Sequence, residues 1–130
     1  MGERVTDTVQ GDGYAVGSLD GLGEGPGFRK IRKPLGVEAF GVNALVLPQG
    51  YTTPKHYHDE QEELYFVHQG EMTIEFGDGA QFTLGPGGVA RVAAQTVRNV
   101  TSSGDGELVF VAVGGKDGYV GRDGRNPENE

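Results

Sequence analysis

The sequence predicts an all-β fold, a sandwich or barrel of short strands, and three observations lead to this prediction. Apolar and polar residues alternate with a period of two along several segments, and no segment keeps a helical period for three turns. Turn-forming residues separate these segments, and the 130-residue chain contains 24 Gly and 6 Pro without a collagen-like period. The length suits a single domain that buries roughly two-thirds of its unfolded surface.

The predicted strands follow one another at short intervals. A short strand at 14–16 lies within the glycine-rich segment 1–27, which we expect to be a flexible N-terminal arm. The remaining strands are expected at 40–47, 64–69, 71–76, 81–84, 89–92, 97–101 and 108–113. The last of these is apolar throughout, which is typical of a strand buried on both faces. We therefore place the compact domain at 28–113 and expect a disordered tail at 114–130, which is polar and rich in glycine.

Composition and charge exclude several classes of function. The chain has no Cys, so disulfides, thiolate metal sites and cysteine nucleophiles are excluded. Its net charge of −8 argues against nucleic acid or an anionic membrane surface as a partner. The sequence shows neither a secretory signal nor an apolar run long enough to cross a membrane, so we expect a cytoplasmic protein.

The residues that carry chemistry gather in one short stretch, where all three histidines of the chain are found. On an extended strand, His56 and His58 point to the same face and Tyr57 points to the other. Glu63 opens the following strand and reaches the same point if the two strands are neighbours. Two imidazoles and one carboxylate form a set that binds Fe(II), Mn(II), Zn(II) or Ni(II) with coordination positions left open. The alternative is a pair of exposed loop histidines beside an acidic run.

The spacing of these residues resembles the first sequence motif of the cupin superfamily. The pattern is Gly50-x5-His56-x-His58-x4-Glu63-x6-Gly70, and it matches the motif at every defining position. Cupins are small jelly-roll β-barrels, also called double-stranded β-helices, in which two antiparallel sheets enclose a lumen. The resemblance implies that the two histidines and the glutamate point into the lumen and bind one divalent metal ion.

The sequence departs from the second cupin motif at four defining positions, which hold Ala93, Gln95, Arg98 and Ser102. Pro86-Gly87 matches the start of that motif, but Arg98 stands where a histidine usually supplies a fourth metal ligand. Arginine stays protonated and cannot bind a metal. Three roles for Arg98 remain open: it clamps an anionic substrate beside a three-ligand metal, it pairs with Glu63 so that no stable metal binds, or it points to solvent.

The strand that Glu63 opens carries further candidates. Counted in steps of two, Tyr65 shares the inward face with Glu63, either as a lumen-filling aromatic ring or as a group that orients a substrate through its hydroxyl. His68 falls on the opposite face, where we expect a surface position. Leu64 and Phe66 also point outward, and together with the N-terminal arm they suggest a homodimer.

The resemblance implies a metal-binding cupin that acts on a small carboxylate or carbonyl compound, with dioxygenase, isomerase and decarboxylase chemistry all open. Two alternatives fit the same features: a non-enzymatic cupin that binds or senses a small molecule, and a metal-free, isomerase-like cupin that uses a histidine as base. Arg98 and Tyr65 are the candidate catalytic residues. His56, His58 and Glu63 are the candidate ligands of one Fe, Mn, Zn or Ni ion, and whether the protein is an enzyme stays open.

Overall fold

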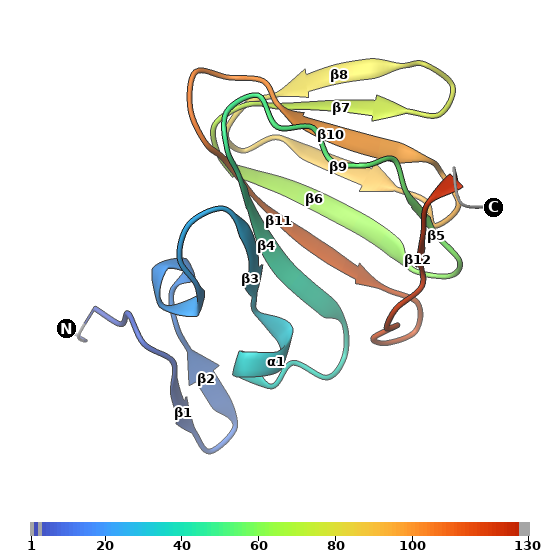
Figure 1. Cartoon of the computed structure of the whole chain (residues 1–130). Helices are drawn as coiled ribbons and strands as arrows, with labels where there is room; N and C mark the ends of the chain where they lie inside the picture. The colour runs from blue at the N-terminus through green and yellow to red at the C-terminus, as the bar shows by residue number, and fades with distance from the viewer. Residues whose placement is uncertain (1, 3, 128–130) are drawn as a thin grey trace.

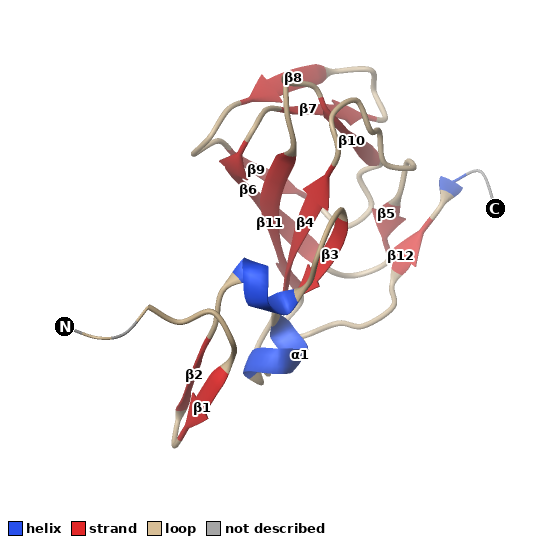
Figure 2. Ribbon diagram, turned by 60° about the vertical axis from the view of Figure 1, so that its left-hand side comes forward, coloured by secondary structure: helices blue, strands red, loops and turns tan. Residues whose placement is uncertain are grey.

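The computed structural model describes residues 2 and 4–127, and these residues form an almost entirely β-stranded protein (Figures 1 and 2). The predicted all-β fold is confirmed. The strands are β1 (Val9–Gly11), β2 (Tyr14–Val16), β3 (Gly27–Lys30), β4 (Gly41–Leu47), β5 (Tyr57–His58), β6 (Glu62–Gln69), β7 (Met72–Phe76), β8 (Gln81–Leu84), β9 (Val89–Val92), β10 (Arg98–Ser102), β11 (Leu108–Gly115) and β12 (Gly124–Arg125). The helical elements are a 3-10 turn at Leu19–Leu22 and the short α1 at Arg32–Leu35.

Two antiparallel sheets form the body of the molecule. The larger sheet has the order β3-β4-β11-β6-β9, and the smaller sheet has the order β10-β7-β8. Strand β11 lies at the centre of the larger sheet, where it pairs with β4 on one side and β6 on the other. Two strand pairs complete the described part of the chain: β1 with β2, and β12 with β5.

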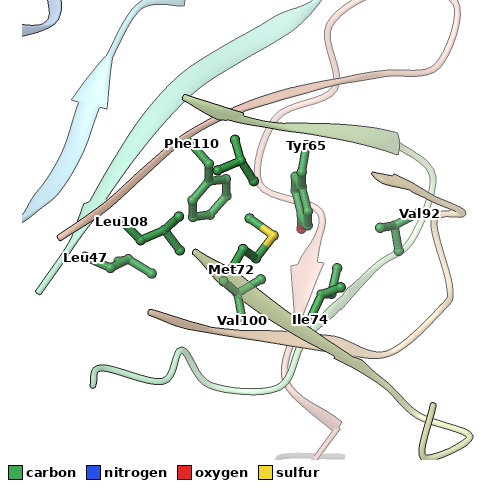
Figure 3. Packing of buried hydrophobic residues seen from close by; sticks show 9 residues of the cluster. Leu47, Tyr65, Met72, Ile74, Val92, Val100, Leu108 and Phe110 are labelled. Atoms are coloured by element: carbon green, nitrogen blue, oxygen red, sulfur yellow. The ribbon is translucent and has the colours of Figure 1, made fainter. Parts of the chain in front are cut away.

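The hydrophobic core lies between the larger sheet and the smaller sheet (Figure 3). Both sheets contribute alternate side chains of their strands, because residues two apart on a strand point to the same face. Each aliphatic side chain that is fully buried here stabilises the fold by about 1.5–3 kcal/mol. The buried members of the core are Leu47, Tyr65, Val67, Met72, Ile74, Val92, Val100, Leu108 and Phe110.

The N-terminal segment lies to one side of the two sheets (Figures 1 and 2). In it, β1 and β2 form an exposed hairpin, and β3 then joins the larger sheet by pairing with β4. Residues 1 and 3 of the expected flexible arm lie outside the described residues. No helix of the described chain is long and apolar enough to cross a membrane.

The C-terminal segment, for which the sequence predicts a disordered tail, lies against the rest of the protein over its described part. Strand β11 continues to Gly115, and β12 returns to pair with β5 beside the histidines. The contacts that hold this return are polar, since Asp123 is buried and its side chain forms four hydrogen bonds with residues 58–61. Such contacts leave no apolar pattern in the sequence, and residues 128–130 lie outside the described residues.

Two glycines of the first motif allow the strands that carry the site to turn. Gly50 has a φ of 81° and Gly70 a φ of 83°, a conformation that disfavours any side chain. A Cβ atom on Gly70 would also lie 2.4 Å from the carbonyl oxygen of Glu107. Gly70 therefore permits the close approach between the β6–β7 turn and the chain that leads into β11.

Candidate metal centre

Three side chains meet at one point beside the core. His56 precedes β5, His58 lies on β5 and Glu63 lies on β6, and one ligand atom from each lies within 4.8 Å of the others. The position of His56 is held by β10, because its backbone exchanges two hydrogen bonds of 3.0 Å with Arg98. The two imidazole rings meet edge to face, with centroids 5.2 Å apart. The structure thus brings together the three residues that the sequence proposes as metal ligands.

The two histidines have opposite electrostatic surroundings. Burial lowers the pKa of His56, and the positive charge of Arg98 lowers it further, so this ring is neutral at neutral pH. Burial alone would also lower the pKa of His58, but hydrogen bonds to Glu63 and Asp123 outweigh burial and raise it. Without a bound metal ion, His58 therefore holds a proton more strongly than an ordinary histidine does.

Glu63 is held in its charged form by its neighbours. Its Oε1 atom accepts hydrogen bonds from the Arg98 guanidinium at 2.5 Å and from the Tyr65 hydroxyl at 2.8 Å, and it lies 3.2 Å from Nε2 of His58. Burial alone would raise the pKa of Glu63, but the hydrogen bonds from His58 and Arg98 lower it to about 2. All these contacts fall on Oε1, and no hydrogen-bond donor of the described chain contacts Oε2.

Arg98 lies behind Glu63, where it is fully buried. Its guanidinium donates to the hydroxyl of Tyr65 at 3.3 Å and to the backbone carbonyls of Ala94 and Thr96 at 3.1 and 2.8 Å, besides the bond to Glu63. The solvent-facing alternative for Arg98 is wrong, because none of its surface is exposed. The observed contacts match the ion pair with Glu63, and Arg98 does not line the cavity described below.

Tyr65 lies on the inward face of β6, as the alternation of that strand predicts, and His68 on the opposite face is exposed. Burial and the charge of Glu63 raise the pKa of Tyr65 well above its usual value, so the hydroxyl keeps its proton. Its ring packs edge to face against Phe110, with centroids 5.5 Å apart. Tyr65 therefore joins the apolar core to the carboxylate of Glu63.

Sequence reasoning missed Asp123, which contacts the site from the C-terminal segment. Its Oδ1 atom lies 2.8 Å from Nδ1 of His58 and accepts a hydrogen bond from the side-chain amide of Gln61 at 2.7 Å. Its Oδ2 atom accepts backbone N–H bonds from Glu60 and Gln61, both at 2.9 Å. Burial would raise the pKa of Asp123, but these hydrogen bonds lower it well below its usual value. No sequence signal marks this aspartate, because it lies 65 positions from His58 in a segment without strand periodicity.

A cavity of about 740 Å³ opens beside the three converging side chains. His56, His58 and Glu63 all line it, and most of the remaining wall is apolar. Among the described residues, Arg122 in the C-terminal segment is the one Lys or Arg that lines the cavity; it is exposed, and it takes part in none of the ion pairs between described residues. Representative apolar lining residues are Phe28, Val42, Leu45, Val100, Phe110 and Tyr119.

Comparison with known families returns one match that covers more than half of the chain. A family model described as "Cupin domain" matches residues 44–114. This range contains His56, His58, Glu63 and Arg98, but it ends before Asp123. No curated protein matches the chain significantly.

Several solved structures share the fold. A cupin protein from Bacteroides fragilis is 24% identical over 72% of this chain and 77% of its own, with a TM-score of 0.63. An uncharacterized protein with a double-stranded β-helix domain from Klebsiella pneumoniae is 20% identical over 78% of this chain and 90% of its own, with a TM-score of 0.67. The DMSP lyase DddQ from Ruegeria pomeroyi is 21% identical over 71% of this chain but 45% of its own, with a TM-score of 0.61. At these identities the likeness is one of fold.

Proposed function

The chain belongs to the cupin family, and we propose that it is a metal-binding cupin that acts on a small carboxylate or carbonyl compound. The observation that carries this proposal is the convergence of His56, His58 and Glu63 within 4.8 Å at the wall of a mostly apolar cavity. Ligand cavities of this size and lining are typical of proteins that enclose a small organic molecule.

The donor set fits one divalent metal ion. Two imidazole nitrogens and one carboxylate oxygen suit Fe(II), Mn(II), Zn(II) or Ni(II), and three protein ligands leave positions for a substrate. His56 is neutral and Glu63 is charged, which are the forms that bind metals. A bound metal would supply an electrophile that polarises a carbonyl or carboxylate oxygen.

The chain's own residues support this chemistry in three ways. Arg98 and Tyr65 hold the Glu63 carboxylate in place through its Oε1 atom. The mostly apolar wall lowers the local dielectric constant and so strengthens electrostatic interactions at the site. Arg122 supplies a positive charge at the cavity wall, and a guanidinium there suits a carboxylate group on the substrate.

The role of Arg122 can be tested with a matched pair of ligands. We expect octanoate to bind the metal-loaded protein more tightly than octanamide, since only octanoate carries the anionic group. Arg122→Gln should reduce this preference, whereas Arg91→Gln, which alters an exposed arginine of β9 paired with Glu62, should keep it in full. Equal affinity of the wild-type protein for both ligands, measured by isothermal titration calorimetry, would argue against a carboxylate substrate.

A non-enzymatic cupin that binds or senses a small molecule is the second candidate. The ion pair between Arg98 and Glu63 favours it, because the positive charge of Arg98 offsets the negative charge that would attract a metal ion. Metal binding separates the two candidates.

Titration of Zn(II) or Mn(II) into chelator-stripped protein tests the first function directly. We expect one equivalent to bind, and we expect His56→Gln and Glu63→Gln each to weaken binding at least 10-fold. His68→Gln is the matched control, because His68 is exposed on the opposite face of β6. Wild-type protein that binds neither metal, or a His68→Gln variant that loses binding as the others do, would favour the second function.

We also propose that the protein forms a homodimer through the outer face of the larger sheet. Leu64 and Phe66 on β6 are 45% and 43% exposed, and Val89, the partner of Phe66 on β9, is 59% exposed. An apolar face of this kind favours association with a second copy. Sedimentation equilibrium should show a dimer that Phe66→Glu dissociates, and a monomeric wild-type protein would contradict this proposal.

A further inference from the structure

We propose that Asp123 is a positioning residue that fixes the tautomer of His58, so that Nδ1 carries the proton and Nε2 is the atom that binds the metal. The inference rests on the metal site proposed above and adds a residue to it. Asp123 lies outside the range 44–114 that the cupin model matches, on a segment that returns to the barrel from the far end of β11. Figure 1 shows this return, with β12 beside β5.

The contact between Asp123 and His58 requires a proton on Nδ1. Oδ1 of Asp123 and Nδ1 of His58 are 2.8 Å apart, and Asp123 and His58 are both buried, with exposed fractions of 6% and 8%. Without a proton between them, the lone pair of the ring nitrogen would face a charged carboxylate oxygen in a site with little water. Neutral imidazole carries its proton on only one nitrogen, so Nδ1–H leaves Nε2 as the ligand atom.

The side-chain amide of Gln61 also lies near Nδ1 of His58, but it does not change the assignment of the proton to Nδ1. Its side-chain nitrogen lies 3.0 Å from Nδ1 of His58 and 2.7 Å from Oδ1 of Asp123. If the amide donated to Nδ1, the ring nitrogen would have to be unprotonated beside the carboxylate. The shorter contact to Asp123 gives the amide proton a charged acceptor, and both donors then converge on Oδ1.

The carboxylate is itself held rigidly. Its Oδ2 atom accepts the backbone N–H groups of Glu60 and Gln61, both at 2.9 Å. The backbone around it pairs with the strand that carries the histidine, since Gly124 is the register partner of His58. A Cβ atom on Gly124 would lie 3.6 Å from Cε1 of the imidazole, so this segment packs directly against the ring.

The other ring nitrogen faces the candidate metal centre. Nε2 of His58 lies 3.2 Å from Oε1 of Glu63, which is the longer of the two carboxylate contacts of the ring. Because Oε1 of Glu63 already accepts hydrogen bonds from Arg98 and Tyr65, a neutral ring with one proton holds it at Nδ1, beside Asp123. Asp123 is not itself a fourth ligand, because it is not among the three residues that converge and hydrogen bonds engage both of its oxygens. Carboxylates that support a ligand histidine in this way typically change metal affinity by 10–100-fold.

Asp123→Asn tests the inference because Asn has nearly the same shape as Asp but places a hydrogen-bond donor where the carboxylate oxygen accepted from His58. The two backbone N–H groups hold the amide oxygen of Asn in the Oδ2 position, so the NH2 group faces Nδ1 of His58. Nδ1 must then accept, and the proton moves to Nε2. Asp59→Asn is the matched control, because Asp59 pairs with Arg125 of the same segment at 2.6 Å and is half exposed.

The tautomer is read by long-range 1H–15N NMR of chelator-stripped protein, at a pH where His58 is neutral. We expect an Nδ1–H signal for His58 in the wild-type protein and in Asp59→Asn, and an Nε2–H signal in Asp123→Asn. Zn(II) affinity should fall 10–100-fold in Asp123→Asn and stay within 2-fold in Asp59→Asn.

An Nε2–H tautomer in the wild-type protein would overturn the inference without any variant, so the test does not depend on whether Asp123→Asn folds. A folded Asp123→Asn variant that keeps the wild-type tautomer and Zn(II) affinity would overturn it as well. Wild-type protein with the Nδ1–H tautomer but no affinity for Zn(II) or Mn(II) would overturn the proposed metal function and support the assigned tautomer.

Discussion

Replacing Arg98 with Met should destabilise the protein strongly, because this arginine is a fully buried charge with a single charged partner. Methionine fills a similar apolar volume but donates no hydrogen bond. The substitution leaves the Glu63 carboxylate, the Tyr65 hydroxyl and the carbonyls of Ala94 and Thr96 without this donor. The main cost is the carboxylate, which stays buried after its counter-charge is removed.

Removal of one partner from a buried ion pair costs about 3–5 kcal/mol. We expect a value near the lower end, since His58 still contacts Glu63 at 3.2 Å and shares its charge. For a chain of this length, about 3 kcal/mol corresponds to a fall in Tm of roughly 10 °C or more. This is a large fraction of the ~5–15 kcal/mol by which a typical domain is stable.

Arg91→Met provides the matched control. Arg91 pairs with Glu62, the neighbour of Glu63 in sequence, but the two side chains are 69% and 53% exposed. Exposed ion pairs contribute about 0.2–1 kcal/mol, so Arg91→Met should lower the Tm by only a few degrees. Both variants are compared with the wild-type protein by urea unfolding and differential scanning calorimetry without metal.

A double variant separates the charge from the volume of the side chain. Adding Glu63→Gln to Arg98→Met removes the unpaired carboxylate and should recover about 1 kcal/mol or more of the loss. If Arg98→Met destabilised the protein no more than Arg91→Met, the buried ion pair would not be a structural element of the fold. The assignment of Arg98 as the residue that holds Glu63 would then be wrong.

Three further predictions follow from the same contacts. Metal binding must displace a proton from His58, because the pKa of this histidine is raised above 6.5. Zn(II) affinity measured by calorimetry should therefore fall as the pH drops through that raised pKa. An affinity that is flat from pH 8 to 5 would contradict ligation by His58. Arg98→His should tighten metal binding at least 10-fold, because position 98 forms a β-bridge with His56 and a histidine at position 98 would project beside His56. Unchanged affinity would mean that the side chain at position 98 does not reach the metal. Gly70→Ala should lower the Tm by several degrees, since φ of Gly70 is 83° and a Cβ would lie 2.4 Å from the carbonyl oxygen of Glu107. Gly106→Ala is the control, because the space around its Cβ position is open, and it should leave the Tm unchanged. Equal effects of the two substitutions would contradict the proposed close approach.

Most strands of the two main sheets could be predicted, because they have an alternating or wholly apolar pattern between turn residues; β3, which lacks such a pattern, lies outside the predicted ranges. Strands β8 and β9 begin and end where the sequence predicts, and the turn Gly85-Pro86-Gly87-Gly88 separates them. Strand β12 was not predicted, because two residues held by backbone pairing and by a buried aspartate carry no periodicity. The order of the C-terminal segment depends on partners that lie far away in the sequence.

The convergence of the three candidate ligands could be predicted for a related reason. His56, His58 and Glu63 lie within eight positions, so local strand geometry nearly suffices to bring them together. The placement of Arg98 stayed open, because a buried and an exposed arginine look alike in sequence until the hydrogen-bond acceptors around them are known. Asp123 was missed altogether, since its role depends on a contact across 65 positions.

Anomalous X-ray scattering from crystals of metal-loaded protein tests the central claim most directly. Data collected on both sides of the absorption edge identify the element and locate it in one experiment. We predict a single strong peak at bonding distance, about 2.0–2.2 Å, from one nitrogen each of His56 and His58 and from a carboxylate oxygen of Glu63. A peak bound to other residues, or no peak in a crystal soaked with Zn(II) or Mn(II), would contradict the account.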